Sequence, residues 1–165
     1  MTPFARVTAA ALVALCVGVG WHRWSAGEER AVRQRLDALT AAVNTTVTDG
    51  LGTLAHAADI GGYFTEDVVV DLGEASAPIV GRATLVGMAR RLQRRTAAFR
   101  LRFDDIGVRL GEEGSAAAVT LTASSTLRDA GEDGESTDAR ELRLAMTKAS
   151  GTWRISRITA VDTLR

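Results

Sequence analysis

The sequence predicts an α+β domain in which N-terminal helices pack on a strongly curved antiparallel sheet, preceded by one transmembrane helix. Three observations support this fold class: an apolar run near the N-terminus, then helical periodicity, then alternation with a period of two through most of the second half. A chain of 165 residues has room for a single core. Basic and acidic residues number 20 each, so no net charge directs the chain toward nucleic acid, and we expect no such partner.

The apolar run extends from Val7 to Trp21. It is shorter than the roughly 20 residues of a comfortable spanning helix, but Phe4 and Trp24 can serve as interface anchors. A cleaved signal peptide would need small residues at a cut site, and only Gly18 and Gly20 are available. A buried helix is a third alternative. We therefore expect residues 1–24 to be a membrane anchor or uncleaved signal, and residues 25–165 to form the folded domain.

The charges around this run leave the orientation in the membrane open. Arg6 and the terminal amine precede the run, and several arginines follow it, so the positive-inside rule alone would keep the domain in the cytoplasm. A short basic lead before a short apolar run is instead typical of export. We expect a single-pass protein of the cell membrane with an extracytoplasmic domain. The only cysteine, Cys16, lies inside the run, so no intrachain disulfide can form.

Two helices are predicted next. Ser25 and Glu28 have the spacing of a capping box, which marks a helix start. One face of the following helix is apolar, with members spaced by three or four residues: Val32, Leu36, Leu39 and Val43. A second, short helix is expected over Leu51–Ala58, before two glycines end it.

From Asp67 the period changes to two. Val68, Val70 and Leu72 then face one way, and Asp67, Val69 and Asp71 face the other, which predicts a half-buried strand. Pro78 and Gly81 bound a brief extended piece. A third helix follows and ends near Arg95, with an inner face formed by Leu85, Met88 and Leu92.

The last part of the chain predicts four strands. In the first of them the apolar side chains change from odd to even positions around Asp104-Asp105, which implies a bulge. The next two strands are expected over Ala116–Leu127 and Arg140–Lys148. The last strand changes phase after Ile155 and should bulge as well. Bulged strands curve, and the preceding helices would cover the concave face.

This order of elements, with YFTEDVVVDLG at Tyr63–Gly73 and GRATLVGMARRL at Gly81–Leu92, resembles the nuclear transport factor 2-like superfamily. That superfamily includes the SnoaL-like polyketide cyclases and ketosteroid isomerase, and the resemblance covers about residues 28 to 163. It implies a cone-like fold, with the curved sheet wrapped around a helix-lined pocket. Because the superfamily holds isomerases, dehydratases, cyclases and members without catalysis, the resemblance does not establish an activity.

The resemblance also implies where catalytic groups would lie. In isomerase-like members a carboxylate base ends the first strand, while a tyrosine of the first helix and a late aspartate stabilise the enolate oxygen. The matching positions here hold Leu72, Leu36 and either Leu142 or Arg143, none of which fits its role. Asp71 would face inward only if the strand slipped by one residue, and that slip would expose the valines.

Three residues remain as catalytic candidates: Asp71, His56 and Tyr63. His56 is the only histidine of the domain and could act as a general base, or it could be a partly exposed helix residue. Tyr63 could line a pocket or belong to the core. No second histidine or cysteine is available in the domain for a metal site, and no phosphate-binding glycine loop is present, so we expect neither metal nor cofactor.

Two charged segments have an ordinary and a functional interpretation. The basic run at residues 90–95 could contact anionic lipid headgroups, or it could be a solvated helix face that suits the helix C-terminus. The acidic segment of residues 128–139 resembles a calcium loop, but Gly131 and Arg140 replace required oxygen ligands, which favours a mobile hairpin loop.

The sequence thus predicts a membrane-anchored, non-catalytic binding or assembly module of the SnoaL-like type that holds a small apolar ligand. We expect a homodimer formed through the sheet. The alternative is a SnoaL-like cyclase, isomerase or dehydratase that acts on a small apolar substrate with Asp71, His56 or Tyr63 as proton carriers. A third alternative is a domain without a ligand, whose interior is filled by side chains.

Overall fold

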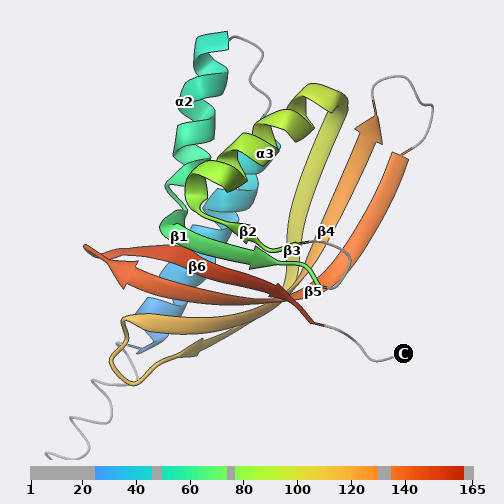
Figure 1. The fold of residues 1–165 in the computed structure, drawn as a ribbon. Coiled ribbons are helices and arrows are strands. Elements are labelled where there is room, and N and C mark those ends of the chain that lie inside the picture. Colours follow the sequence, from blue (N-terminus) through green and yellow to red (C-terminus); the bar gives the residue numbers. More distant parts are fainter. Residues whose placement is uncertain (1–24, 46–49, 74–76, 130–134, 162–165) are drawn as a thin grey trace, which may run out of the picture.

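The computed structural model describes residues 25–45, 50–73, 77–129 and 135–161 (Figure 1). The predicted membrane anchor, residues 1–24, therefore lies outside the described residues. Within those ranges, none of the helices combines the length and the apolar character that crossing a bilayer requires.

Three helices and six strands make up the described part of the chain. The N-terminal helix occupies residues 25–44, and the other two helices are α2 (Gly50–Gly61) and α3 (Arg82–Arg95). The strands are β1 (Phe64–Asp71), β2 (Ile79–Val80), β3 (Thr96–Leu110), β4 (Ala116–Asp129), β5 (Glu135–Ala149) and β6 (Thr152–Ala160). The α+β class and the order of elements are those that the periodicity predicts.

The six strands form one sheet in the order β2-β1-β6-β5-β4-β3. Neighbouring strands are antiparallel except β1 and β6, which are parallel, so the sheet is mixed. The prediction of a wholly antiparallel sheet was wrong. Alternation of side chains along a strand is the same whichever way its neighbour runs, so the pattern cannot show that the last strand pairs with the first.

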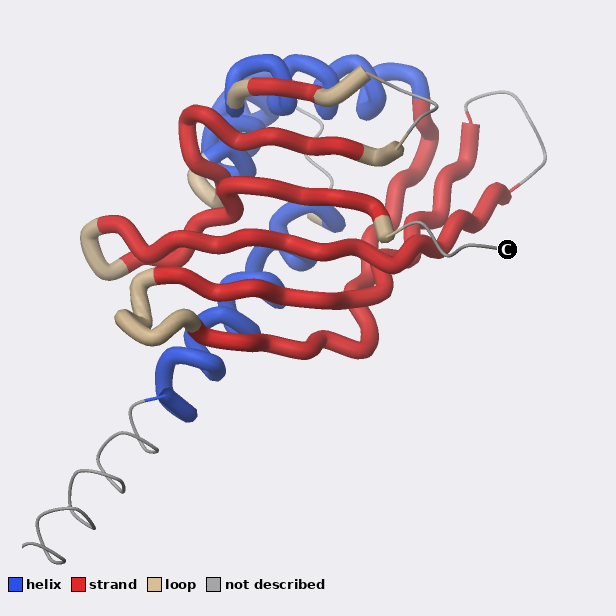
Figure 2. Tube along the Cα trace, turned by 60° about the horizontal axis from the view of Figure 1, so that its bottom comes forward, coloured by secondary structure: helices blue, strands red, loops and turns tan. Residues whose placement is uncertain are grey.

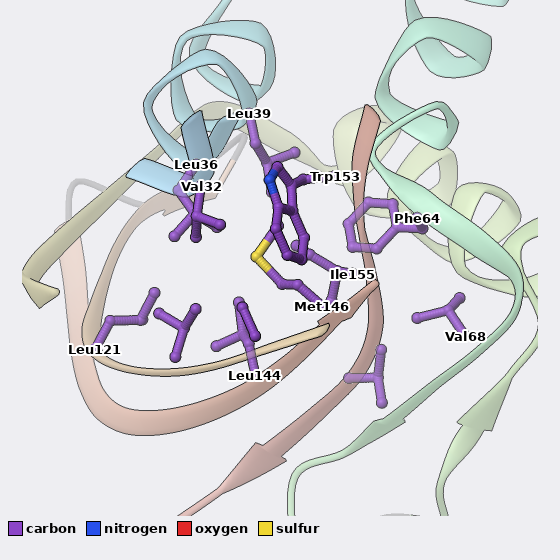
Figure 3. Packing of buried hydrophobic residues seen from close by; sticks show 13 residues of the cluster. Val32, Leu36, Leu39, Phe64, Val68, Leu121, Leu144, Met146, Trp153 and Ile155 are labelled. Atoms are coloured by element: carbon purple, nitrogen blue, oxygen red, sulfur yellow. The ribbon is translucent and has the colours of Figure 1, made fainter. Parts of the chain in front are cut away.

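The N-terminal helix lies on the concave side of the sheet, as predicted (Figures 1 and 2). Its fully buried side chains, Val32 and Leu36, belong to one cluster with Leu121 of β4 and with Leu144 and Met146 of β5 (Figure 3). Burying side chains of this size contributes about 1.5 to 3 kcal/mol each. Helix and sheet therefore stabilise each other through one hydrophobic core.

Both predicted bulges are present. The register of β3 against β4 shifts between Asp104 and Gly107, and Asp105 has a φ of 53°, in the left-handed region. The register of β5 against β6 shifts between Ala145 and Met146. Each bulge bends its strands and lets apolar side chains before and after it face the core.

The outer edge of β3 is covered by the N-terminal helix. Asn44 donates from Nδ2 to the Leu101 carbonyl at 2.8 Å and accepts from the Leu101 amide at 2.7 Å, as a neighbouring strand would. Arg33 donates to the Ile106 carbonyl at 2.6 Å. These contacts satisfy part of an edge that would otherwise be open to pairing with another chain.

The sheet has two ends, a near end and a far end. The near end consists of the turns at residues 111–115 and 150–151, which meet where the Lys148 amide donates to the Ser115 carbonyl. The far end consists of residues 96–104, 122–129 and 135–142, at the opposite ends of the long strands, where α3 continues into β3 (Figure 1).

Candidate functional site

The interior of the curved sheet is hydrophobic throughout its buried part. Among the described residues, no polar or charged residue is classed as buried. The core cluster is formed by Val32, Leu36, Leu39, Phe64, Val68, Val70, Ala117, Val119, Leu121, Leu144, Met146, Trp153 and Ile155. Such a surface can exclude water and bind apolar groups.

The inner face becomes accessible toward the far end. Along β4, Val119 and Leu121 are buried, whereas Ala123 is half-buried. Phe103 of β3 and Leu142 of β5 are also half-buried and pack against the core. This hydrophobic surface at the far end is the part of the inner face on which an apolar molecule could settle.

Asp71 lies on the outer face of the sheet. Val70 is buried and pairs with Ile158, and the next pair is Asp71 with Thr159, which face the opposite side. The Asp71 carboxylate accepts a hydrogen bond from the Gly73 amide at 3.1 Å and so closes the end of β1. Val68, Val70 and Asp71 therefore have the facing that the period predicts, and Leu72, just after the strand, is 38% exposed.

Tyr63 takes part in a structural network. The Arg35 guanidinium lies over its ring, 4.0 Å from the centroid, a favourable cation–π contact. Arg35 also donates to the carbonyls of Gly62, at 2.8 Å, and Trp153, at 3.1 Å. Arg35 thus joins the N-terminal helix to β6 and to the turn between α2 and β1.

His56 is half-buried on α2, and its Nε2 atom is buried without a hydrogen-bond partner among the described residues. Asp71, His56 and Tyr63 are not brought together as one site. Tyr63 and Asp71 are separated by the whole of β1, roughly 25 Å, and Asp71 faces away from the interior. Of the three candidates, only His56 has a buried polar atom that lacks a partner in the described part of the chain.

A largely buried ion pair that the sequence did not reveal lies at the near end. Lys148 Nζ contacts both carboxylate oxygens of Glu28, at 2.6 and 2.7 Å, and the Trp153 indole donates to the same carboxylate at 3.1 Å. The hydrogen bond from Lys148 is the main cause that lowers the pKa of Glu28. Because Glu28 and Lys148 lie 120 positions apart, no local sequence signal could have paired them.

The remaining candidates fall partly outside the described residues. The hairpin loop at 130–134, which resembles a calcium loop, is one of these segments. Within the described part of the chain, no three histidine, cysteine, aspartate or glutamate residues gather closely enough to hold a metal ion. Of the basic run, Arg90 is half-buried, Arg91 is exposed, and the side chains of residues 92–95 are not described.

Comparison with known proteins gives one family. A family profile described as "SnoaL-like domain" matches residues 24–159. No curated protein matches the chain.

Several solved structures share the fold. A protein provisionally assigned as a scytalone dehydratase, from Novosphingobium aromaticivorans, has a TM-score of 0.71 and 15% identity over 85% of this chain and 87% of that chain. A provisionally assigned aromatic ring hydroxylase from the same organism has a TM-score of 0.66 and 20% identity over 84% and 91%. ActVI-ORFA from Streptomyces coelicolor has a TM-score of 0.62 and 12% identity over 84% and 99%.

Proposed function

The chain belongs to the family of SnoaL-like domains, and from this premise we propose that it is a membrane-anchored, non-catalytic binding module that holds a small apolar molecule. The anchor is residues 1–24, and the domain lies outside the cytoplasm. The bound molecule rests on the half-buried inner face at the far end, against Phe103, Ala123 and Leu142. The observation that carries the proposal is the hydrophobic interior, in which the buried described side chains are all apolar.

Catalysis next to a carbonyl needs a base about 3 Å from the carbon acid and a donor aimed at the oxygen that gains charge. Leu72 and Leu36 hold the positions that isomerase-like relatives use for those groups, and neither can carry a proton. Asp71 is on the outer face. These three placements favour binding over proton transfer.

The second candidate function is a SnoaL-like enzyme, a cyclase, isomerase or dehydratase. One observation in this chain favours it: the buried, unpartnered Nε2 of His56. The provisional assignment of one structural neighbour as a scytalone dehydratase also points this way. The two functions differ in whether a bound carbonyl compound is changed.

A pair of substitutions on one strand tests the binding site. Ala123→Phe would fill the inner face at the far end, whereas Ala118→Phe adds the same bulk to the exposed outer face of β4. The ligand probe is 5-androstene-3,17-dione, and binding is measured by equilibrium dialysis. We expect saturable binding of the steroid. Ala123→Phe should raise the dissociation constant by about tenfold or more, because the ligand can no longer bury apolar surface at this position. Ala118→Phe should leave the dissociation constant unchanged.

Melting temperatures of both variants show whether each one is folded. Equal weakening by the two substitutions, or no saturable binding by the unchanged protein, would count against the binding site. If the unchanged protein converts the steroid during dialysis and the His56→Ala variant does not, the enzyme function is favoured instead.

A further inference from the structure

Four arginines form a patch on the outer face of the sheet: Arg109 of β3, Arg143 of β5, and Arg154 and Arg157 of β6. Their direction follows from the register. Arg157 pairs with Ala145, Ala145 pairs with Ala118, and Ala118 pairs with Arg109, so these four residues form one row across the sheet. Both alanines are exposed, which places the row on the outer face.

The other two members face the same way. Arg143 lies between half-buried Leu142 and buried Leu144, and Arg154 lies between buried Trp153 and Ile155. Strands are about 4.8 Å apart, so the row from Arg157 to Arg109 spans about 14 Å. We call Arg109, Arg143, Arg154 and Arg157 the arginine patch.

The patch has no acidic partner within the described part of the chain. None of the ion pairs there includes Arg109, Arg143, Arg154 or Arg157, and Arg154 Nε is buried without a hydrogen bond. At the far end two outer-face arginines are ion-paired, Arg102 with Asp104 at 2.8 Å and Arg128 with Glu135 at 3.6 Å. Arg100, opposite Thr126, has no ion pair among the described residues. The half of the outer face nearer to the turns of the near end thus carries four unpaired arginines, and the far half carries one.

The patch adjoins the place where the chain continues toward residues 1–24. Glu28, in the first turns of the N-terminal helix, is held by Lys148 and Trp153. Arg154 follows Trp153 directly and points to the other side of the sheet. Figure 2 shows the outer face toward the viewer, with the N-terminal helix leaving at the end where β5 turns into β6.

The surroundings of the patch suit a broad, flat anionic surface. Ala118, Ala145 and Thr120 lie between the arginines and are small and exposed, so a plane can approach all of the guanidinium groups together. Glu112 and Glu113 in the turn at the near end would be repelled by negative charge. That repulsion disfavours an end-on approach. Glu141, two residues from Arg143 on the outer face, would be repelled too, so the contact is limited to the part of the outer face that carries the arginines.

We propose that the arginine patch docks on anionic lipid headgroups of the membrane that holds residues 1–24, so that the domain lies with its outer face on the bilayer. The proposal rests on the anchor proposed above. If Val7–Trp21 enters the bilayer, only residues 22–24 separate it from the described helix, a reach of at most about 11 Å. Guanidinium groups bind phosphate oxygens in bidentate fashion, and this orientation leaves the far end open to ligand.

The test uses the full chain with a fluorophore at Thr120→Cys in a Cys16→Ser background, reconstituted in vesicles that contain a nitroxide-headgroup lipid. Phosphatidylcholine vesicles are compared with vesicles that carry phosphatidylglycerol. The patch variant carries Arg109→Gln, Arg143→Gln and Arg157→Gln. The control also loses three arginines, all of them ion-paired: Arg102→Gln and Arg128→Gln on the outer face, and Arg140→Gln, which is opposite Ala123 on the inner face.

We expect quenching on the anionic vesicles only, reversed by high salt. Each arginine at an anionic surface contributes about fivefold to the docking equilibrium, so the patch variant should lose docking on the order of a hundredfold. The control should keep it. Two results would overturn the docking proposal: equal quenching on both vesicle types, or no quenching on either type although the chain floats with the vesicles. An acidic protein surface would then be the partner to seek.

Vesicle flotation separates this proposal from the anchor. A chain that floats with neutral vesicles in high salt is anchored, whatever the fluorophore reports. The anchor would be refuted, and the patch supported, if the unchanged chain floats only with anionic vesicles at low salt and the patch variant does not float with them. A chain that floats with neither would refute both.

Discussion

At the scale of single residues, the structure separates groups that hold the fold from groups that could act on a ligand. Arg35 and Glu28 both anchor the N-terminal helix to the last strands, through Trp153 and Lys148 respectively, a role that the sequence pattern did not indicate. Asp71, one of the three catalytic candidates from the sequence, closes a turn on the outer face. His56 keeps a buried nitrogen with no partner among the described residues.

Glu28→Gln should destabilise the protein by about 2 kcal/mol, because it weakens charge-assisted hydrogen bonds in a site where Glu28 is only 14% exposed. The matched control is Glu29→Gln, whose pair with Arg33 is about 40% exposed on both sides and contributes about 0.5 kcal/mol or less. Urea unfolding at neutral pH measures both. Equal losses in the two variants would contradict a special role for Glu28.

The same pair gives a pH dependence with a defined sign. The pKa of Glu28 is lowered in the folded state, chiefly by the hydrogen bond from Lys148. Its stabilising contribution is therefore present above the unfolded-state pKa, about 4.3, and is lost as the pH falls through the folded-state pKa. We expect the stability difference between the unchanged protein and Glu28→Gln to shrink steadily below about pH 4. A difference that stays constant from neutral to acid pH would contradict this assignment.

At the scale of elements, the periodicity of the sequence predicted those features that depend on which neighbouring side chains are buried. The spacing of Val32, Leu36 and Leu39 predicted the buried helix face, and the phase change at Asp104-Asp105 predicted the bulge. Pairing between distant strands was not accessible in this way, because the parallel match of β1 with β6 leaves no trace in either strand's alternation. The same reason explains why the Glu28–Lys148 pair and the arginine patch could be found only in the structure.

Asn44→Ala should expose the edge of β3, because the amide side chain satisfies both the N–H and the C=O of Leu101. Two lost hydrogen bonds predict a destabilisation of about 1 to 3 kcal/mol, and an unprotected edge predicts faster aggregation on warming. Thr45→Ala is the control, since its hydroxyl bonds only within its own helix, to Ala41. Light scattering during a thermal ramp measures the aggregation; identical onset temperatures in the two variants would refute the edge-protection role.

At the scale of the whole molecule, the outer face is divided between two proposed contacts. The arginine patch lies in the half nearer to residues 25–28, and the neutral row Thr122, Ser124 and Thr126 lies toward the far end. We proposed from sequence a homodimer through the sheet, and the far half remains available for a second copy. The two contacts would use different parts of one surface.

Residues 25–165 on their own should sediment as a dimer at micromolar concentration, because the small hydroxyl side chains of the outer face can meet their copies without charge repulsion. A charge at the centre of the row, as in Ser124→Asp, should dissociate the dimer by placing like charges opposite each other. The matched control, Ser124→Asn, adds similar bulk without the charge and should leave the dimer intact. Sedimentation that shows a monomer at every concentration would refute the dimer.

The anchor and its orientation are tested together in cells. Protease added to spheroplasts should degrade the domain, and the intact protein should have a mass that still includes Met1 to Trp24. Full protection of the domain would contradict the extracytoplasmic orientation. A mass that begins near Trp21 would contradict the anchor.

Hydrogen exchange shows whether the interior binds an apolar molecule without moving the protons of that molecule. The protein is incubated with 5-androstene-3,17-dione in D2O, and NMR follows replacement of the hydrogens next to the carbonyl. Because loss of one oxyanion donor costs about a hundredfold in rate, and the base position also lacks a carboxylate, the account predicts exchange no faster than in buffer. Exchange accelerated by the protein and abolished in His56→Ala or Asp71→Asn would contradict it.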